Sequence, residues 1–256
     1  MSKLPKEHQF IDLSDYGRPF AKLIAFALKD TFLTPIHITI TFVISGLLAV
    51  LCIIYDSYWA ALFFLVLKSI LDAADGELAR IKETPSYTGR YLDSISDIIL
   101  NLLIFMAIWF VTEGSIGYTF LAFFGIQLQG TLYNYYYVIL RKKYHGDTTS
   151  RVFEKKVPKA MKGEKQFNVN LLFGIYRALY GPFDSIIYGL DRGAAAGKSL
   201  PKWFMSAIST FGLGFQLLII GLLLALGFKH LIVPFFIGYS GFIFVFIGVR
   251  RLINRK

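Results

Sequence analysis

Apolar positions along this 256-residue chain gather in long runs separated by short charged or polar connections. A membrane-spanning helix needs roughly 20 mostly apolar residues. Six stretches meet that requirement, and their ends are uncertain by a few residues: about 35–54, 59–78, 91–111, 116–140, 203–226 and 231–249. The pattern predicts an all-α fold, a polytopic membrane protein with six transmembrane helices and no soluble domain.

Two further stretches mix apolar and charged positions. In Asp15–Asp30 the apolar residues recur near helical spacing among three basic residues, which predicts an amphipathic helix lying on the membrane surface. Asn168–Gly193 is apolar but interrupted by charges and by Gly181-Pro182, so it predicts two short surface helices with a turn at that dipeptide. Ordinary packing of both stretches is an equally open interpretation.

Composition supports the membrane assignment. Hydrophobic residues make up 55% of the chain and charged residues 17%, well above the apolar content of an ordinary soluble domain. Cys52 is the single cysteine, which excludes a disulfide framework.

Basic residues account for a net charge of +10 and cluster at the ends of the apolar runs. That position predicts contact with anionic lipid headgroups rather than with nucleic acid. Among Lys and Arg, the short connections after the first, third and fifth runs carry only Lys229. The terminal segments and the other connections, on the opposite side of the membrane, are rich in Lys and Arg. The positive-inside rule therefore places both termini in the cytoplasm of a multi-pass protein of the cell (inner) membrane.

One connection is acidic where the second apolar run ends and the third begins. Asp72 and Asp75 are three residues apart, and Asp93 and Asp97 are four apart, so each pair shares one face of its helix. Two helices joined by a short turn at Pro85 can aim all four carboxylates at one point. Arg80 and Lys68 would compensate this charge in part, with Lys68 one turn before Asp72 and able to pair with it.

Divalent cations would compensate the acidic cluster better. Oxygen-only ligands without Cys or His favour Mg²⁺, Mn²⁺ or Ca²⁺ over zinc. Mg²⁺ typically binds through a few carboxylates together with substrate phosphates. Two ions bridging a pyrophosphate would stabilise charge on a leaving group, and the small residues Gly76 and Ala79 leave room for a phosphorylated ligand.

The spacing of these residues resembles the signature of the CDP-alcohol phosphotransferase family, D-x-x-D-G-x-x-A-R-x8-G-x3-D-x3-D. Eight positions of the chain match it: Asp72, Asp75, Gly76, Ala79, Arg80, Gly89, Asp93 and Asp97. The layout also resembles the family throughout, with six spans, an amphipathic N-terminal helix and both termini inside. Members often carry Pro-Asn before the first span, whereas this chain has Ile36 at the Asn position, followed by His37. Substitution of the Asn by His37 is one interpretation, and a histidine without a ligand role is the favoured one.

The resemblance implies roles for the matched residues. Asp72, Asp75 and Asp93 would ligate Mg²⁺ or Mn²⁺, two ions in all, with Asp97 at the edge of that shell and also the general base. A nucleotide- and phosphate-binding group would accompany them: Gly76, Ala79, Arg80 and Gly89. The resemblance also implies a homodimer.

The resemblance divides the chain into a cytoplasmic segment, residues 1–33, with the interfacial helix, and a six-helix transmembrane catalytic domain, residues 34–256. A basic cytoplasmic loop with interfacial helices would occupy residues 141–202. Its basic residues could recruit an anionic lipid or a phosphorylated acceptor, although a solvated membrane-facing loop is the favoured interpretation. Polar positions of the fourth run would line an acceptor pocket or join helices through hydrogen bonds, and both interpretations stay open: Gln127, Gln129, Thr131 and Asn134.

The expected function is transfer of a phosphatidyl group from CDP-diacylglycerol to a small polar alcohol, with release of CMP. The first alternative is transfer of phosphocholine or phosphoethanolamine from a CDP-alcohol to diacylglycerol. A divalent-cation transporter is the alternative from another class, although a transporter would place such a site near the bilayer midplane. The acceptor alcohol is not readable from the motif.

Overall fold

A computed structural model describes residues 4–144, 154, 156–197 and 199–255, and every regular element within them is helical. The α-helices are α1 Arg18–Leu28, α2 Pro35–Ile54, α3 Tyr58–Ile81, α4 Tyr87–Thr112, α5 Ile116–Lys143, α6 Gln166–Leu190, α7 Lys202–Ile208, α8 Leu213–Ala225, α9 Ile232–Ser240 and α10 Phe242–Arg255. The 3₁₀ turns are η1 Lys6–His8, η2 Leu13–Asp15, η3 Arg192–Ala194, η4 Ser209–Phe211 and η5 Lys229–Leu231.

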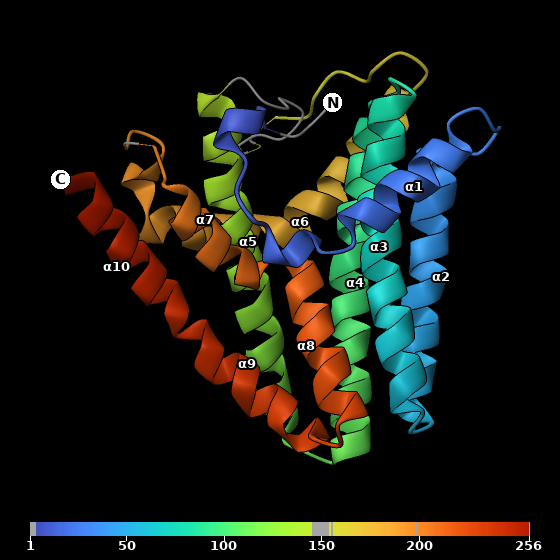
Figure 1. Ribbon diagram of the computed structural model, residues 1–256, viewed down its shortest axis with the longest axis vertical. Helices are drawn as coiled ribbons and strands as arrows, with labels where there is room; N and C mark the ends of the chain where they lie inside the picture. Colours follow the sequence, from blue (N-terminus) through green and yellow to red (C-terminus); the bar gives the residue numbers. More distant parts are fainter. Residues whose placement is uncertain (1–3, 145–153, 155, 198, 256) are drawn as a thin grey trace.

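An upright bundle forms the body of the molecule. Helices α2, α3, α4, α5 and α8 stand side by side, and α9 and α10 return along the outside, so that both ends of the chain lie at the upper end in Figure 1. α3 packs against α2 on one side and α8 on another, and α2 also contacts α4. Apolar side chains buried between these helices form the main core, among them Leu65, Phe105, Ile108 and Ile220. The bundle places the end of α3 and the start of α4 together at the upper end.

The all-α fold is confirmed for the described residues, but six transmembrane helices are not. By length and composition, α2, α4 and the segment Lys229–Ile253 are long and apolar enough to cross a membrane. A fourth span results if Lys202–Phe211 and Leu213–Ala225, which are bent by 51°, count together. α3 and α5 fill the second and fourth predicted runs, but charged side chains in α3 and glutamines in α5 make them more polar.

A close contact accounts for the break between α7 and α8, which the sequence predicts as one span. The backbone of Gly212 is extended, and η2 of the N-terminal segment lies directly against it. A Cβ atom at Gly212 would come within 2.3 Å of Ser14, and one at Gly214 within 2.0 Å of the Ser14 carbonyl oxygen. The Leu13 N–H donates to the Ser209 hydroxyl at 2.8 Å. The two glycines therefore leave space for the N-terminal segment at η2, which side chains at these positions would exclude.

The prediction of two short helices in Asn168–Gly193 is wrong. α6 is one helix that continues through Pro182. A proline disfavours helical backbone at the preceding residue in part through that residue's Cβ, and Gly181 has none. Only one helical hydrogen bond is then lost at Pro182, and neighbouring helices support the rest, because α6 packs against both α4 and α5.

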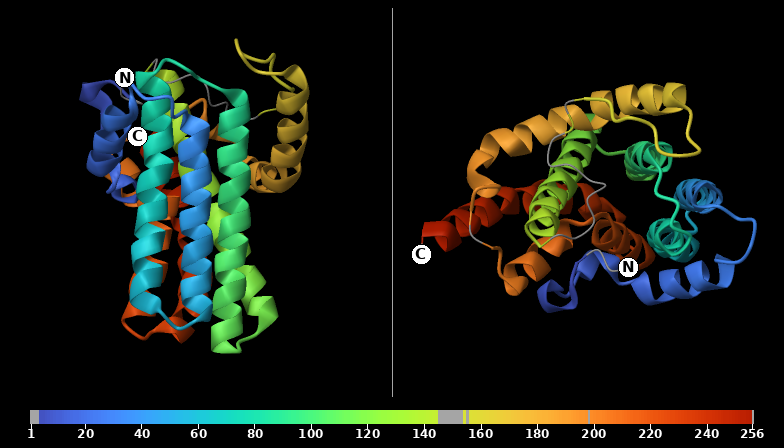
Figure 2. Two further views of the ribbon diagram at one scale, coloured as in Figure 1. Left: turned by 90° about the vertical axis from the view of Figure 1, so that its right-hand side faces the viewer. Right: turned by 90° about the horizontal axis from the view of Figure 1, so that it is seen from above.

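The predicted amphipathic helix near the N-terminus is present as α1. It packs across α3, and Ala21 and Ala25 are buried against the bundle. Phe20, Leu23 and Phe26 are 60–67% exposed on its outer side. α1 and α6 lie on opposite sides of the bundle (Figure 2).

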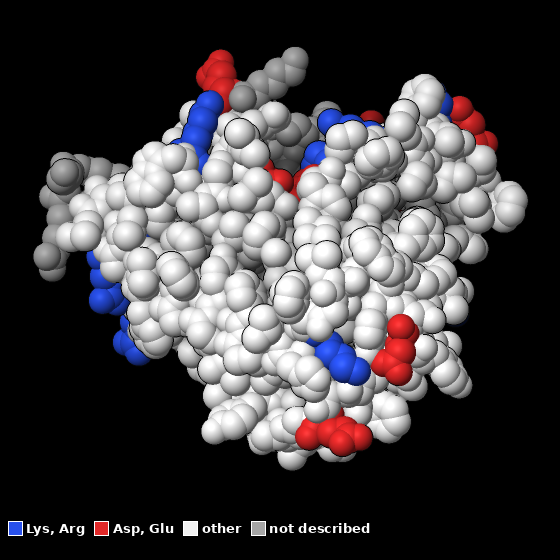
Figure 3. Space-filling view, turned by 60° about the horizontal axis from the view of Figure 1, so that its bottom comes forward, with Lys and Arg blue, Asp and Glu red and all other residues white. Residues whose placement is uncertain are grey.

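The surface agrees with a membrane location. Seen with the lower end forward, the body of the molecule is almost free of charged side chains (Figure 3). Large apolar side chains are exposed around the bundle, for example Ile44, Phe63, Phe110 and Phe244. The basic loop is described only in part, since residues 145–153, 155 and 198 lie outside the described residues.

Candidate active site at the α3–α4 junction

The signature residues lie where α3 ends and α4 begins. α3 continues to Ile81, which keeps Asp72 and Asp75 on one helical face, and α4 starts at Tyr87 with Ser86 as its N-cap. Glu83 turns the chain with a positive φ of 53°. The hairpin of two helices that the spacing of the acids predicts is therefore present.

Three of the four predicted acids come together. Carboxylate oxygens of Asp72, Asp75 and Asp93, one from each, lie within 4.8 Å of one another. Asp75 is only 9% exposed, and Oδ1 of Asp93 is buried without a hydrogen-bond partner in the described residues. A buried acceptor without a partner costs free energy, and a divalent cation would satisfy it. The donor set is all oxygen, so the cluster fits Mg²⁺ or Mn²⁺.

Asp97 lies one turn further along α4 and has a different partner. Its carboxylate forms an ion pair with the Lys68 ammonium, from one turn before Asp72 on α3. Lys68 is completely buried, and the Asp97 side chain is 15% exposed. Sequence reasoning expected Lys68 to compensate the acids through Asp72, whereas the hydrogen bond in the structure goes to Asp97.

Thr39 is a neighbour of the cluster that sequence reasoning missed. Its hydroxyl donates to Oδ2 of Asp75 at 2.7 Å from α2, and Thr39 is 2% exposed. Residues that hydrogen-bond a ligating carboxylate fix its orientation. A threonine within an apolar span is the available sequence signal, but it does not reveal which carboxylate the hydroxyl contacts.

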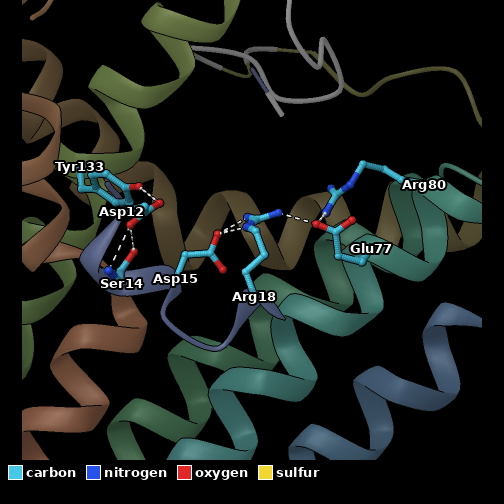
Figure 4. A network of polar contacts seen from close by, with 7 residues as sticks. All are labelled: Asp12, Ser14, Asp15, Arg18, Glu77, Arg80 and Tyr133. Carbon is cyan, nitrogen blue, oxygen red and sulfur yellow. Dashed lines mark hydrogen bonds and ion pairs between the residues drawn. The ribbon is translucent and has the colours of Figure 1, made fainter. Parts of the chain in front are cut away.

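Arg80, predicted to bind phosphate, is held by its own helix. Glu77 accepts from Arg80 at 3.0 Å and also pairs with Arg18 of α1, which in turn contacts Asp15 (Figure 4). A Cβ atom at Gly76 would lie 3.6 Å from the Arg80 guanidinium, so this glycine leaves space beside it. Nε of Arg80 is buried without a partner in the described residues, which leaves a donor available to an anion.

Gly89 lies in the first turn of α4, where its N–H donates to the Ser86 hydroxyl at 2.8 Å. Ser86 donates in turn to Glu164, which also accepts the Thr88 N–H at 2.6 Å and the Met161 N–H at 2.9 Å. Burial alone would raise the pKa of Glu164, but these hydrogen bonds outweigh it and hold the pKa below its usual value of 4.5. A carboxylate is favourable at a helix N-terminus, so Glu164 fixes the start of the helix that carries Asp93 and Asp97.

A second acidic residue, Glu154, contacts α4 further out. It accepts from Arg90 at 2.5 Å and from the Tyr91 hydroxyl at 2.7 Å. Glu154 also borders a cavity of about 320 Å³ whose other walls belong to α6, including Tyr176 and Asp184. This cavity lies outside the acidic cluster, and the signature residues do not line it.

The polar positions of α5 separate into two kinds. Gln129 is fully buried and joins helices, because it donates to Ser240 at 3.0 Å and accepts from Gln216 at 3.0 Å. Nε2 of Gln127 is buried with no partner in the described residues, and Asn134 is exposed. For Gln129 the interhelical interpretation is confirmed, and for Gln127, Thr131 and Asn134 both interpretations stay open.

His37 caps a helix. The Thr34 N–H donates to Nδ1 of His37 at 3.1 Å in the first turn of α2. The favoured interpretation, a histidine without a ligand role, therefore has a structural reason. It does not replace the missing Asn through any contact that the described residues show.

Comparison with known proteins identifies the family. A search of curated proteins finds no match. The family model described as CDP-alcohol phosphatidyltransferase matches residues 32–162, about half of the chain, and these include the whole acidic cluster. Members transfer substituted phosphate groups, and this function, together with the apolar helices, indicates an integral membrane protein of phospholipid biosynthesis. The chain belongs to the CDP-alcohol phosphatidyltransferase family.

Proposed function

We propose that this protein transfers a phosphatidyl group from CDP-diacylglycerol to a small polar alcohol and releases CMP. The observation that carries the proposal is the convergence of Asp72, Asp75 and Asp93 within 4.8 Å, with the Arg80 guanidinium on the same helix. The family description supports transfer from a CDP-linked donor, and the choice of CDP-diacylglycerol over a CDP-alcohol of choline or ethanolamine is part of the proposal. Membership of a transferase family also argues against the transporter alternative.

The acidic cluster is proposed to hold Mg²⁺ or Mn²⁺, through Asp72, Asp75 and Asp93, and two ions remain the prediction. Bound there, the metal would offset the negative charge that develops on the departing diphosphate oxygen. Arg80 would pair with the donor phosphates through a guanidinium that Glu77 already orients. Gly76 and Ala79 would leave the face of α3 open to the nucleotide, and Gly89 would do the same at the start of α4.

Asp97 is proposed as the general base. The oxygen of the alcohol attacks the phosphorus that carries diacylglycerol, and the bond from that phosphorus to the bridging oxygen breaks. CMP leaves with the bonding electrons, and the hydroxyl proton passes to the Asp97 carboxylate. α4 runs away from the upper end, so Asp97 lies one turn deeper than Asp93, where an alcohol could enter between the helices.

The location follows the same proposal. Both termini and the junction of α3 and α4 lie at one end of the bundle (Figure 1), and the basic residues of the sequence favour the cytoplasm for that end. Residues 1–33 would then form a cytoplasmic segment whose helix α1 contacts the membrane surface. The remainder, residues 34–256, would form the catalytic domain, working as a homodimer.

The decisive experiment follows CMP release by the purified protein in detergent micelles. CDP-diacylglycerol or CDP-choline with diacylglycerol is supplied with Mn²⁺ or Mg²⁺ and a panel of alcohols, and mass spectrometry identifies the lipid product. We expect CMP release and a new phosphodiester lipid with CDP-diacylglycerol, and a loss of at least 100-fold in Asp97→Asn. Equal rates for wild type and Asp97→Asn with every donor would refute the proposal.

A further inference from the structure

A buried lysine divides the four signature carboxylates into two groups. Lys68 and Asp72 are one turn apart on α3, and Asp93 and Asp97 are one turn apart on α4. Asp72, Asp75 and Asp93 lie together near the end of α3 and the start of α4. One turn deeper in the bundle, the Lys68 ammonium pairs with the Asp97 carboxylate. The cluster therefore holds three carboxylates, and the fourth has its own cation.

The position of Lys68 is fixed from two sides. Its side chain is 0% exposed, and the ammonium pairs with Asp97 of α4. The same ammonium lies 5.0 Å from the centre of the Phe42 ring of α2, at a distance that favours a cation–π contact. A buried cation without its anion is strongly unfavourable. Burial therefore favours the pairing of the Lys68 ammonium with Asp97, the carboxylate that it contacts.

We propose that Lys68 is a positioning residue that holds the Asp97 carboxylate outside the metal shell, so that Asp97 serves as base and not as ligand. This inference rests on the proposed function and changes one part of the family-derived expectation, which puts Asp97 at the edge of the metal site. A divalent cation stabilises the ionised form of a bound carboxylate more than a monovalent ammonium does, so a metal ligand is the weaker proton acceptor of the two. The ammonium offers Asp97 a single hydrogen bond and leaves its second oxygen for the alcohol.

Mn²⁺ affinity distinguishes a metal site of three carboxylates from one in which Asp97 is a fourth ligand. Mn²⁺ binding is measured without any CDP-lipid, by the electron paramagnetic resonance signal of free Mn²⁺, on purified wild type and variants. Asp97→Asn should bind Mn²⁺ within about twofold of wild type. Asp93→Asn, one turn earlier on the same helix, should lose at least tenfold, since removal of a direct ligand weakens a site more than removal of a distant charge.

Removal of the lysine tests the holding role itself. In Lys68→Met, Asp97 is free to join the cluster, so Mn²⁺ affinity should rise about fivefold or more. The kcat should fall about 100-fold, while KM for the CDP-lipid stays within about twofold, since only the base is displaced. The double variant Lys68→Met/Asp97→Asn should return Mn²⁺ affinity to the wild-type value.

The outcomes that would overturn the inference are distinct from failure of the proposed function. A tenfold loss of Mn²⁺ affinity in Asp97→Asn would show that Asp97 is a ligand, and unchanged or weaker affinity in Lys68→Met would show that Lys68 does not hold it away. If wild type transfers nothing from any CDP donor, the proposed function fails and the two affinity comparisons still decide the role of Lys68. If Lys68→Met does not fold, the comparison of Asp97→Asn with Asp93→Asn still decides whether Asp97 is a ligand, and a tenfold loss in Asp97→Asn overturns the inference.

Discussion

Replacing Thr39 by valine tests whether the neighbouring helix orients the metal-binding face. The Thr39 hydroxyl donates to Oδ2 of Asp75 at 2.7 Å, and both side chains are at most 9% exposed. Valine keeps the branched shape and removes only the hydroxyl, so the effect on activity reports this hydrogen bond. We expect Thr39→Val to weaken metal-dependent activity without unfolding the protein.

The magnitude follows from the charge and burial of the pair. A hydrogen bond to a charged group contributes about 1.5–3 kcal/mol, and a loss of about 2 kcal/mol corresponds to roughly 30-fold in an equilibrium constant. Loss of a group that orients a metal ligand typically costs about 10–100-fold in metal affinity or activity. Both estimates predict that the Mn²⁺ concentration for half-maximal CMP release rises by about 30-fold.

Thr41→Val is the matched control. Thr41 lies half a turn further along α2, is exposed, and donates at 2.8 Å to the carbonyl of His37 in its own helix. Its replacement should leave the Mn²⁺ midpoint within about twofold of wild type. If Thr39→Val also stays within twofold, α2 does not orient Asp75 and the reasoning is refuted.

Three further predictions concern other parts of the molecule. Asp93→Asn should abolish CMP release while the protein keeps its helical circular dichroism and its elution volume, and an equal loss of folded protein would instead indicate a structural role. Glu164→Gln should destabilise the fold by about 1 kcal/mol at neutral pH; because the folded-state pKa of Glu164 is lowered, this difference is fully present above its unfolded pKa and should disappear as pH falls through the folded value. Thermal unfolding at pH 7 and pH 4 measures it, and a difference that grows on acidification would contradict the assignment. Gln129→Leu should lower stability by about 1 kcal/mol, since Gln216 Nε2 loses one of its two acceptors and keeps the Ile126 carbonyl, and leave KM for the alcohol unchanged; a raised KM would place Gln129 in the acceptor site.

Hydropathy predicts helix positions well where a run is continuous. The first predicted run, 35–54, coincides with α2, and the third and fourth agree with α4 and α5 within four residues at each end. The prediction is wrong where a break depends on the neighbour and not on the residue. Pro182 lies inside a helix because Gly181 relieves its steric clash, whereas Gly212 ends one because another segment packs against it.

The candidate site shows the same division. Spacing along two helices predicts that all four acids converge, since helical periodicity fixes the faces, and Asp72, Asp75 and Asp93 do so while Asp97 pairs with Lys68. The partners of these acids were not predictable in the same way. Thr39 is 36 residues from Asp75, and Lys68 is 29 residues from Asp97. Only the packing of α2, α3 and α4 decides which of several nearby acids each one contacts.

Two residues outside the family-matched segment contact the signature region. Residues 32–162 contain the acids, but Arg18 pairs with Glu77 from before that segment, and Glu164 caps α4 from just after it. Arg18 therefore influences Arg80 through their shared carboxylate, and Glu164 sets the first turn of the helix that carries Asp93. On the proposed function, the acids and their spacing would carry the phosphoryl transfer. On the same proposal, the groups that would meet the nucleotide and the alcohol are held in part by residues outside the eight signature positions, and the signature by itself leaves the acceptor open.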